Sequence, residues 1–418
     1  MNETAVAGHD LSSSPHELLV DMSVIAQHDA GTGIQRVVRA VFAQLRRLPL
    51  RNCVVRPVAA SRHHAYRYLP ASFPDAPLSV ELDTCPIVAG RPGDVFLGLD
   101  LASAIMPWHE AQLAEWRIKG VSISVLVYDL LPLLHGEWFR RPARKHFRRW
   151  IRLLERQADQ VICNADEVSA QFEKWNRRWW RSRSARIVPA RTLPLSGDIA
   201  ASVPSRGIPE NANAILEWIG QRTTVLMVGT VEPRKGYDQA LAAFEVLWKE
   251  LGDQAPALLV IGRPGWKTKR LQLRLRTLSS FEGPLLWLDD ISDEFLEIVY
   301  AKVHGLLFAS RGEGFGLPVV EALGKGLSVL VRDLPVLQAN LVPDTARFSG
   351  DRPRDLATAI TAWLTAPKAD KPPGVGYPGR TWETVAFELA AALDLPMALP
   401  AAKPGQPFDR KASASGVK

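Results

Sequence analysis

The stretch Ala309-Ser310-Arg311-Gly312-Glu313-Gly314-Phe315-Gly316-Leu317-Pro318-Val319-Val320-Glu321-Ala322 decides the fold of this chain. It follows an apolar run, Val303–Phe308, that is typical of a buried strand, and it leads into a helix, since Pro318 suits a first helical turn. Three glycines in five positions let the backbone come close to a ligand. The free amides of a helix start and the positive end of its dipole would face the same space. The stretch therefore predicts a diphosphate site.

Two carboxylates flank this glycine-rich turn. Glu313 lies in the loop and Glu321 lies in the helix, with seven residues between them, so both can point at a hydroxyl-rich ligand such as a sugar or a ribose. A glutamate between two glycines stabilises neither a helix nor a strand, which favours a functional role. The stretch Glu313–Glu321 resembles the Glu-x7-Glu signature of retaining glycosyltransferases of family GT4, which have the GT-B fold.

The composition is that of a globular protein with more than one domain. A length of 418 residues exceeds the usual size of a single core, so two domains are expected. Hydrophobic residues make up 47% and charged residues 23%, as in soluble proteins. No apolar run reaches the roughly 20 residues of a membrane span, and the polar start predicts no signal peptide. Three scattered cysteines, Cys53, Cys85 and Cys163, suit reduced thiols, so we expect a cytoplasmic protein.

The charge predicts an anionic partner. Lys and Arg number 51 against 44 Asp and Glu, a net charge of +7, which suits nucleic acid, a membrane surface or a phosphorylated substrate. The excess gathers in residues 140–157, which are amphipathic and basic, and in residues 172–183, which interleave Arg and Trp. An anionic lipid surface, single-stranded nucleic acid and a plain helix with tryptophans in the core all fit this pattern. We expect residues 140–183 to rest on the inner face of the cytoplasmic membrane, and we expect no nucleic acid.

The first half opens with a strand, a glycine turn and a helix. The strand is Leu18–Val24, and the turn His28–Arg36 contains Gly31 and Gly33. From its residues alone the pattern fits any α/β nucleotide fold. The turn resembles the first glycine loop of GT4 enzymes, which faces the donor diphosphate across the cleft. Gly-Thr-Gly-Ile-Gln-Arg is a recurrent opening in bacterial polysaccharide mannosyltransferase-like members. The resemblance implies that Gly33 lies beside that diphosphate.

A later strand, Ser122–Tyr128, ends in Asp129. Functional side chains gather at the carboxyl ends of strands in an open parallel sheet, although a cap of the next element is the simpler explanation of Asp129. Many GT4 enzymes carry His-Asp at this point, with the histidine near the transferred sugar. This chain has Tyr128 in its place, and spacing does not assign the role to His135. The resemblance implies a catalytic position for Asp129 and leaves the role of Tyr128 open.

The second half carries a basic turn, Gly229-Thr230-Val231-Glu232-Pro233-Arg234-Lys235-Gly236, between a strand and a helix. Arg can fork onto a phosphate and Lys supplies a point charge, although a solvated loop pair is the alternative. The turn resembles the Gly-x-x-x-Glu-x-Arg-Lys-Gly motif of GT4 enzymes, whose basic residues bind donor phosphates. The resemblance implies that role for Gly229, Arg234 and Lys235. Thr230 stands where several relatives carry another phosphate-binding arginine.

The domain limits follow from turn formers and from the end of the chain. Residues 193–211 are rich in Pro, Gly and Ser and mark a boundary. A helix at about residues 380–393 is expected to cross back to the first domain, as is common in GT-B proteins. We therefore divide the chain into residues 1–205, residues 206–395 and a disordered tail, residues 396–418.

No metal site is expected. The spacing of Asp290 and Asp293 could suggest one, but Ser292 or Asp293 as a helix N-cap, with Glu294 in the first turn, explains it better. Asp-x-Asp, the usual metal clamp of GT-A transferases, is missing from the sequence. We expect neither a metal nor another cofactor.

The resemblance extends in layout over about residues 18–393. It implies an α/β protein with two doubly wound Rossmann-like domains that face a central cleft, the GT-B fold. It also implies a retaining hexosyltransferase that uses a nucleotide sugar, with GDP-mannose or a related GDP-deoxyhexose as the leading donor. The acceptor would be a polyprenyl-diphosphate-linked or growing bacterial surface glycan. The alternatives are a UDP-sugar transferase with a soluble acceptor, and a nucleic-acid-binding protein that uses the Trp/Arg segment.

The implied site has three parts. Glu313 would hold the sugar and stabilise the cationic anomeric centre, and Glu321 would bind ribose hydroxyls. The donor diphosphate would be held by Arg234, Lys235 and the stretch Gly314, Phe315 and Gly316. Fixed cations and helix termini would then stabilise the leaving group without a metal.

Overall fold

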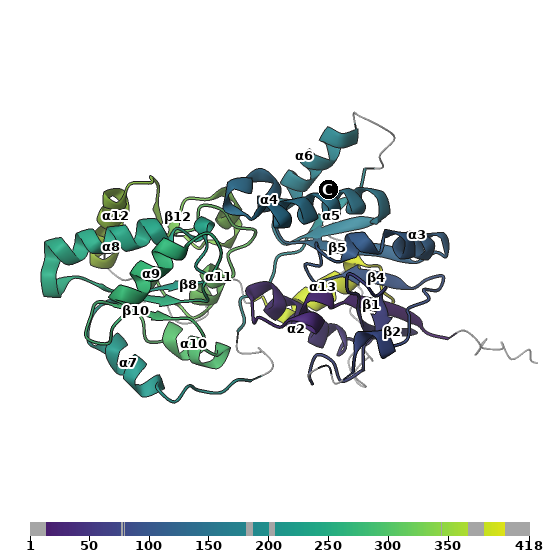
Figure 1. Ribbon diagram of the computed structural model, residues 1–418, viewed down its shortest axis with the longest axis horizontal. Helices are drawn as coiled ribbons and strands as arrows, with labels where there is room; N and C mark the ends of the chain where they lie inside the picture. Colours follow the sequence, from purple (N-terminus) through teal and green to yellow (C-terminus); the bar gives the residue numbers. More distant parts are fainter. Residues whose placement is uncertain are drawn as a thin grey trace, which may run out of the picture.

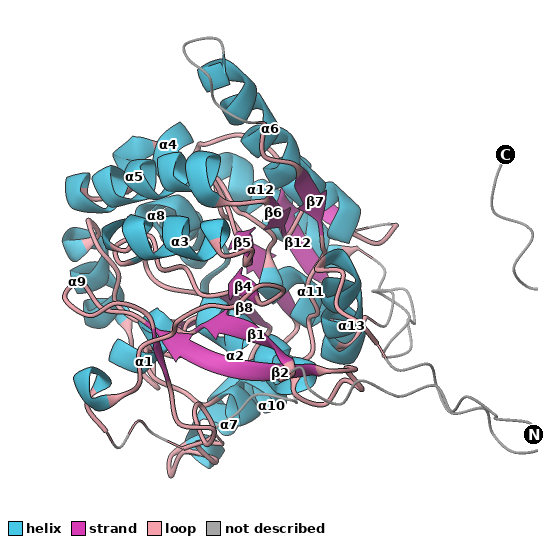
Figure 2. Ribbon diagram, turned by 90° about the vertical axis from the view of Figure 1, so that its right-hand side faces the viewer, coloured by secondary structure: helices cyan, strands magenta, loops and turns pink. Residues whose placement is uncertain are grey.

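The computed structural model describes residues 14–76, 78, 80–180, 187–199, 205–343, 345–366 and 380–397. It has two α/β domains side by side, each built on one sheet (Figure 1). Helices lie on both sides of the strands, with α3 (Glu110–Ile118) and α5 (Arg141–Gln157) on one side of the first sheet and α13 (Trp382–Ala392) on the other (Figure 2). This layering is that of a doubly wound protein.

The first sheet has seven strands in the order β3-β2-β1-β4-β5-β6-β7. Neighbouring strands run parallel, except that β3 is antiparallel to β2. Leu18, Leu19 and Val20 in β1 are fully buried, as expected for a strand covered on both faces. The strands are β1 (His16–Asp21), β2 (Cys53–Ala59), β3 (Arg67–Tyr68), β4 (Val95–Gly98), β5 (Ser122–Val127), β6 (Gln160–Cys163) and β7 (Ala190–Thr192).

Strand β1 ends earlier than the sequence predicted. We expected it to continue to Val24, but it stops at Asp21. The Asp21 carboxylate accepts hydrogen bonds from the backbone amide and the hydroxyl of Ser23, and this turn begins a short helix. The remaining helices of the first domain are α1 (Ser23–Gln27), α2 (Gly33–Leu45), α4 (Leu131–Leu134) and α6 (Asp166–Trp180).

The second sheet has six parallel strands in the order β10-β9-β8-β11-β12-β13. The strands are β8 (Thr224–Val228), β9 (Ala257–Ile261), β10 (Leu285–Leu288), β11 (Gly305–Phe308), β12 (Val329–Arg332) and β13 (Ala346–Phe348). The helices are α7 (Ala212–Gly220), α8 (Tyr237–Leu251), α9 (Lys269–Leu278), α10 (Asp293–Tyr300), α11 (Leu317–Gly324) and α12 (Pro353–Thr365). The 3-10 turns of the chain are Leu82–Thr84, Met106–Trp108, Gly136–Trp138, Pro233–Lys235, Gly252–Gln254 and Pro335–Asn340.

Both sheets reverse their strand order at the first strand. In the first sheet β1 lies between β2 and β4, and in the second β8 lies between β9 and β11. Loops that leave such neighbouring strands in opposite directions open a crevice at the carboxyl edge, and ligands of doubly wound proteins bind there. We call these two places the switch points of the first and second sheets.

The last helix returns to the first domain. α13 packs beside α2, and the Gln160 side chain of β6 donates a hydrogen bond to the Ala392 carbonyl at 2.8 Å. Met397 then pairs with Leu50, so the chain is placed slightly beyond the start of the tail predicted at residue 396. Residues 398–418 of that tail lie outside the described residues.

The basic stretch 140–183 forms α5 and α6, with β6 between them. Arg148 and Arg149 are exposed on α5. Trp150 is fully buried, so this tryptophan belongs to the core and not to a surface that could rest on lipid. The side chains of residues 178–183 lie outside the part of the chain that the structure describes.

Candidate active site

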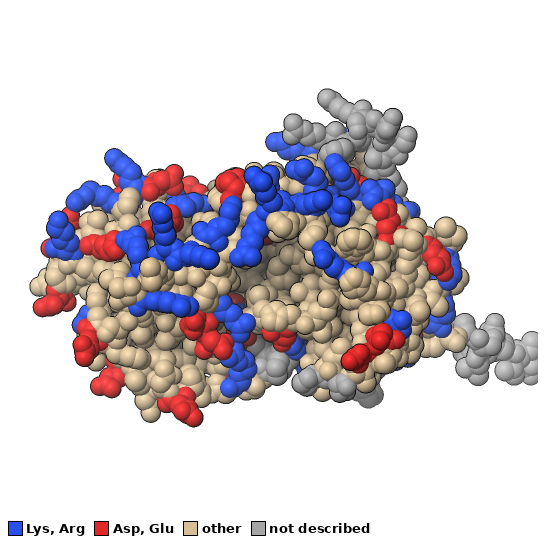
Figure 3. All heavy atoms as spheres, in the orientation of Figure 1, with Lys and Arg blue, Asp and Glu red and all other residues tan. Residues whose placement is uncertain are grey.

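A cleft of about 560 Å³ lies between the carboxyl ends of the two sheets. Its walls come from the segments that follow β1, β4, β5 and β6 in the first domain and β8, β9, β10 and β11 in the second. Figure 3 shows the hollow between the domains, with Lys and Arg side chains gathered along its upper rim. The two switch points therefore face one shared space.

The glycine-rich loop between β11 and α11 forms one wall of this cleft. Gly316 caps α11 with φ +89°, a left-handed conformation that favours glycine. A Cβ on Gly314 would lie 1.9 Å from the Tyr128 carbonyl oxygen, so only glycine lets this loop meet the end of β5. Among the described residues, none accepts a hydrogen bond from the backbone amides of Gly314, Phe315 or Gly316. Three donors thus remain available beside the positive end of α11.

Phe315 contributes through its backbone. Its side chain is buried, and its carbonyl accepts a hydrogen bond from the Asn340 side chain at 2.8 Å. This contact ties the loop to the residues that follow β12. Gly229, at the end of β8, also acts through the backbone, because its carbonyl accepts the Tyr237 hydroxyl at 2.6 Å and its φ is +131°.

Arg234 and Lys235 meet Glu313 at the second switch point. Glu313 accepts Arg234 Nη1 at 2.7 Å and Lys235 Nζ at 2.6 Å, and Arg234 Nε lies 2.8 Å from Glu232. A Cβ on Gly236 would lie 2.2 Å from the Ala309 carbonyl oxygen, so glycine is required where the two loops pack together. The sequence separated these motifs by 78 residues, and the sheet brings them into contact.

The charge state of Glu313 follows from these contacts. Burial pushes its pKa up, but the charges of Arg234 and Lys235 outweigh burial and hold the pKa at about 2. Glu313 is therefore ionised at neutral pH and cannot act there as a general acid. It can accept hydrogen bonds from a hydroxyl-rich ligand and stabilise a positive centre beside it.

Asp129 and Tyr128 approach the same place from the first domain. Burial raises the pKa of Asp129, while the nearby Arg234 opposes that rise. One Asp129 oxygen accepts the Leu131 amide at 2.9 Å, so the residue also caps the turn that follows β5. The Tyr128 hydroxyl donates to the Leu99 carbonyl at 2.8 Å, and burial raises its pKa well above 10. Tyr128 is thus a wall of the cleft with its hydroxyl already engaged.

His135 does not reach the cleft wall. Its ring stacks on Trp138 with centroids 4.2 Å apart, and it is half exposed. The cleft-lining residues do not include it. Spacing in the sequence gave His135 no role, and its position in the structure gives it none in this site.

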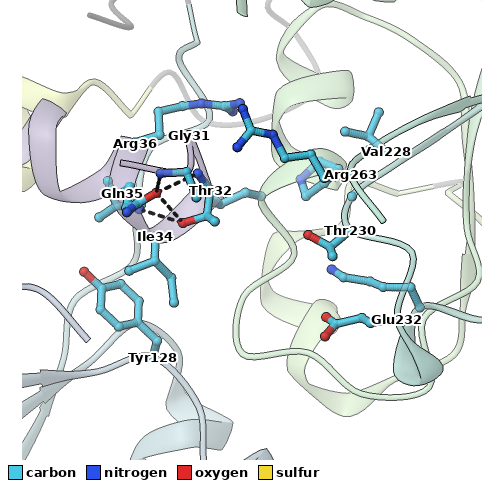
Figure 4. Close-up of a pocket in the computed structure, with 18 of the residues that line it drawn as sticks. Gly31, Thr32, Ile34, Gln35, Arg36, Tyr128, Val228, Thr230, Glu232 and Arg263 are labelled. Atoms are coloured by element: carbon cyan, nitrogen blue, oxygen red, sulfur yellow. Dashed lines mark hydrogen bonds between the residues drawn. The ribbon is translucent and has the colours of Figure 1, made fainter. Parts of the chain in front are cut away.

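The glycine turn of the first domain forms the opposite wall. Thr32 caps α2 and exchanges hydrogen bonds with Gln35 in a capping box. A Cβ on Gly33 would lie 3.3 Å from the Leu317 side chain, so this turn touches the start of α11 in the second domain. In Figure 4, the turn that carries Thr32 and Ile34 lies on the opposite side of the cleft from Thr230 and Glu232, and the Ile34 side chain points toward Tyr128.

Glu321 is bound by a residue that the sequence analysis did not assign. Arg36 Nη1, from α2, donates to Glu321 Oε1 at 2.6 Å, and the Tyr300 hydroxyl donates to Oε2 at 2.8 Å. The same guanidinium forks onto Asp293, with Nε 3.0 Å from Oδ2. Arg36 lies in the quoted turn of the sequence, but no local signal shows that its partners are 257 and 285 residues away.

The sequence analysis did not assign two further hydrogen-bond acceptors on the cleft wall. Asn164, after β6, and Glu232 are both buried, and within the described chain Asn164 Oδ1 and Glu232 Oε2 have no hydrogen-bond partner. Buried acceptors without partners are costly unless a ligand or water supplies a donor. The sequence shows the Glu232 position in its motif, but Asn164 carries no signal of its own.

The aspartates after β10 have structural partners. Asp290 lies between Arg206 and Arg263, at 2.8 Å and 3.1 Å. The sequence analysis predicted Ser292 or Asp293 as the N-cap of this helix, and Ser292 is the N-cap of α10. Its hydroxyl accepts a hydrogen bond from the Phe295 amide at 3.1 Å. The described part of the chain holds no group of three or more His, Cys, Asp or Glu arranged for a metal.

Comparisons with known proteins agree with this architecture. Residues 210–374 match the family model of glycosyl transferases group 1. The chain is 37% identical to the serotype-specific mannosyltransferase WbdA of Escherichia coli over 407 residues. This match covers 96% of this chain and 47% of that protein. It is 34% identical over 164 residues to the O-antigen chain mannosyltransferase B of Escherichia coli, 38% of this chain and 42% of that protein. The chain thus spans about half the length of the first curated relatives it matches.

Two solved structures share the fold. Sucrose-phosphate synthase from Thermosynechococcus elongatus superposes with a TM-score of 0.56 and 18% identity, over 90% of this chain and 94% of that chain. HepE from Anabaena, in complex with UDP and glucose, superposes with a TM-score of 0.56 and 14% identity, over 90% of this chain and 95% of that chain. At such identities the likeness concerns the fold.

Proposed function

Since residues 210–374 form a glycosyl transferases group 1 domain and the chain has the GT-B fold, we propose that it is a retaining mannosyltransferase. In this proposal it transfers mannose from GDP-mannose to a growing bacterial surface glycan. Two of the relatives reported above are a serotype-specific mannosyltransferase and an O-antigen chain mannosyltransferase, and these activities favour that sugar and that acceptor class.

The observation that carries the proposal is the cluster at the second switch point. Arg234 and Lys235 line the same cleft as three backbone amides that donate to no described residue. Two fixed cations and a helix start suit a diphosphate, and they would stabilise the charge that develops on it when the sugar leaves. Such a site supplies charge stabilisation from the chain itself, which is why the proposal includes no metal.

Glu313 and the unpaired acceptors suit the sugar. Ionised Glu313 would accept sugar hydroxyls and stabilise positive charge at the anomeric carbon. Asn164 Oδ1 and Glu232 Oε2 offer further acceptors on the same wall. Asp129 faces these groups from the first domain, where the acceptor glycan would enter. Glu321 would accept hydroxyls of the ribose.

The decisive experiment is an assay of GDP release from GDP-mannose with a mannose-terminated, lipid-linked oligosaccharide as acceptor. We expect release with GDP-mannose and not with UDP-glucose, and an axial, α-configured linkage in the product by NMR. Lys235→Met should abolish turnover, while Lys249→Met, an exposed lysine at the end of α8, should not change it. Turnover with UDP-glucose alone would support the UDP-sugar alternative, and an inverted linkage would contradict the retaining mechanism.

The lipid-linked acceptor also suits the basic surface of the first domain. Arg148 and Arg149 are exposed on α5, and Lys and Arg gather over α4 and α5 in Figure 3. The described residues include no helix long and apolar enough to cross a membrane. An anionic bilayer attracts such a face by roughly 1 kcal/mol per basic residue, so we include peripheral binding to the membrane in the proposal.

Flotation with vesicles tests this part separately. We expect the protein to float with vesicles that contain phosphatidylglycerol and to stay behind with phosphatidylcholine alone. Arg148→Gln with Arg149→Gln should reduce flotation, whereas Lys269→Gln with Arg270→Gln, two exposed charges on α9 of the second domain, should not. Equal loss in both double variants would mean that net charge alone drives binding, and α5 would have no special role.

A further inference from the structure

Arg36 connects the two domains at the carboxylate proposed to bind the ribose. It belongs to α2 of the first domain, while Glu321 and Asp293 belong to α11 and α10 of the second. The guanidinium gives one N–H to Glu321 at 2.6 Å and forks onto Asp293 with its other two nitrogens. Only 15% of the Arg36 side chain is exposed, so the contact is a packed part of the interface.

Glu321 depends on this partner for its charge. The carboxylate is 3% exposed, and the charged and titratable groups that face it are Arg36 from α2 and Tyr300 and Asp293 from α10. Burial raises the pKa of Glu321, and the charge of Arg36 together with the Tyr300 hydrogen bond opposes that rise. Without the guanidinium, a buried carboxylate beside a second carboxylate would take up a proton more readily.

An ionised carboxylate accepts more hydrogen bonds than a protonated one. Each Glu321 oxygen has one protein donor, so each keeps a lone pair for a ligand. Both Arg36 and Glu321 line the cleft, so a ribose could reach this carboxylate without displacing the arginine. The fork onto Asp293 fixes the guanidinium plane, and this in turn fixes the direction of the remaining Glu321 lone pairs.

We propose that Arg36 is a positioning residue of the donor site, supplied by the opposite domain, that keeps Glu321 ionised and oriented to accept ribose hydroxyls. This inference rests on the proposed function, in which Glu321 binds the ribose. Because the three partners come from two domains, the ribose site is complete only when the domains are closed. Donor binding and domain closure therefore favour one another.

If the inference is right, the effect of Arg36 on nucleotide affinity depends on the ribose hydroxyls and on pH. Titration calorimetry with GDP and with 2′,3′-dideoxyguanosine diphosphate, from pH 5.5 to 8.5, measures both. In Arg36→Met we expect GDP to bind about 10- to 100-fold more weakly, as for a lost hydrogen bond to a charged group. The dideoxy nucleotide should bind almost equally to the variant and the wild type. The pH at which GDP binding becomes half-maximal should move upward in the variant, because a protonated Glu321 must first lose its proton.

Two further variants separate positioning from folding. Arg36→Lys keeps the charge and loses the fork, so its pH profile should stay near that of the wild type, with an intermediate affinity. Arg39→Met removes an arginine from the same helix whose partners, Asp29 and the Pro74 carbonyl, belong to the first domain, and it should bind GDP normally. Thermal melting of each variant shows whether it is folded at the temperature of the titration.

The outcomes distinguish this inference from the proposed function. If the wild type binds both nucleotides equally, Glu321 does not bind the ribose and the role of Arg36 falls with it. If the wild type prefers GDP and Arg36→Met keeps the full preference at every pH, the ribose placement stands and the role of Arg36 alone is wrong. Tighter binding of GDP by Arg36→Met would also overturn the inference, because Arg36 would then be a competitor of the ribose.

Discussion

The two sheets carry carboxylates at equivalent places but give them different partners. In the first sheet Asp21 ends β1 and Asp100 follows β4, and their hydrogen bonds come from neutral donors. In the second sheet Glu232 follows β8 and Glu313 follows β11, and their partners are Arg234 and Lys235. Both pairs lie at the switch point of a doubly wound sheet.

The different partners give the carboxyl groups at the two switch points different pKa values. Burial raises the pKa of Asp21 to about 7 and that of Asp100 to about 6, even though hydrogen bonds from backbone amides and hydroxyls oppose it. The cations hold the pKa of Glu313 at about 2. The carboxylates of the first switch point thus order their own backbone, whereas those of the second hold two cations, Arg234 and Lys235, in the cleft. Topology alone does not decide where a ligand binds.

The largest expected effect comes from removing the counter-charge of the second switch point. Glu313→Gln leaves Arg234 and Lys235 in a mostly buried site with one carboxylate fewer, which we expect to cost about 3 kcal/mol in the free energy of unfolding. Urea unfolding measures this. GDP should raise the melting temperature more in the variant than in the wild type, because the diphosphate replaces the lost negative charge. A loss below about 1 kcal/mol would mean that the cations are solvated and not held by Glu313.

The next effect concerns the contact that brings the two switch points together. Gly314→Ala places a methyl group against the Tyr128 carbonyl, at an unrelaxed distance of 1.9 Å, so the loop and β5 must separate. We expect a loss of about 2 kcal/mol, as for overpacking, and a loss of turnover. Gly324→Ala, at the end of the helix α11 that follows this loop and with open space around it, is the control. Normal turnover in Gly314→Ala would show that close approach of the domains is dispensable.

A smaller effect should appear at the first switch point as a dependence on pH. The pKa of Asp21 in the folded protein, about 7, exceeds the ordinary aspartate value of 3.8, so the folded state holds an extra proton between these pH values. The free energy of unfolding should therefore fall as pH rises through this window. Asp21→Asn does not titrate, so relative to the wild type it should gain about 2 kcal/mol between pH 4 and pH 6. Parallel stability profiles of the two proteins would contradict the assignment of this buried acid.

The smallest effect is expected where the same ion-pair chemistry lies in water. Arg274 and Glu245 form a close pair at 2.6 Å, but both side chains are exposed. We expect Arg274→Met to change the free energy of unfolding by less than about 0.5 kcal/mol, in contrast to Glu313→Gln. A change comparable to that of Glu313→Gln would show that burial is not what separates the two sites.

The sequence predicted the strands and the glycine loops well because those signals are local. Strand β5 runs over Ser122–Val127, one residue short of the predicted Ser122–Tyr128, and β11 covers Gly305–Phe308 within the predicted apolar run Val303–Phe308. The end of β1 was missed because Asp21 and Ser23 form a turn that competes with the strand. α9 and α12 were not predicted, and their short amphipathic patterns are weak signals.

The site was predicted as a set of motifs and not as a set of contacts. Pairing of Glu313 with Lys235 and of Glu321 with Arg36 depends on how the sheet and the two domains bring distant residues together. The residues of each motif do not by themselves predict which distant residue will form the ion pair. The same holds for Gly314, whose need to be glycine comes from a carbonyl in the other domain. The residue types were therefore predictable, but the network that sets their charge was not.

The most direct test of the account compares the binding of GDP and GMP by titration calorimetry. If the cations of the second switch point hold the donor diphosphate, the wild type should bind GDP about 10- to 100-fold more tightly than GMP. Lys235→Met should remove most of that difference, and Lys249→Met should keep it. Equal affinity of the wild type for GDP and GMP would contradict the central claim that the fixed positive charge of the second domain binds the diphosphate.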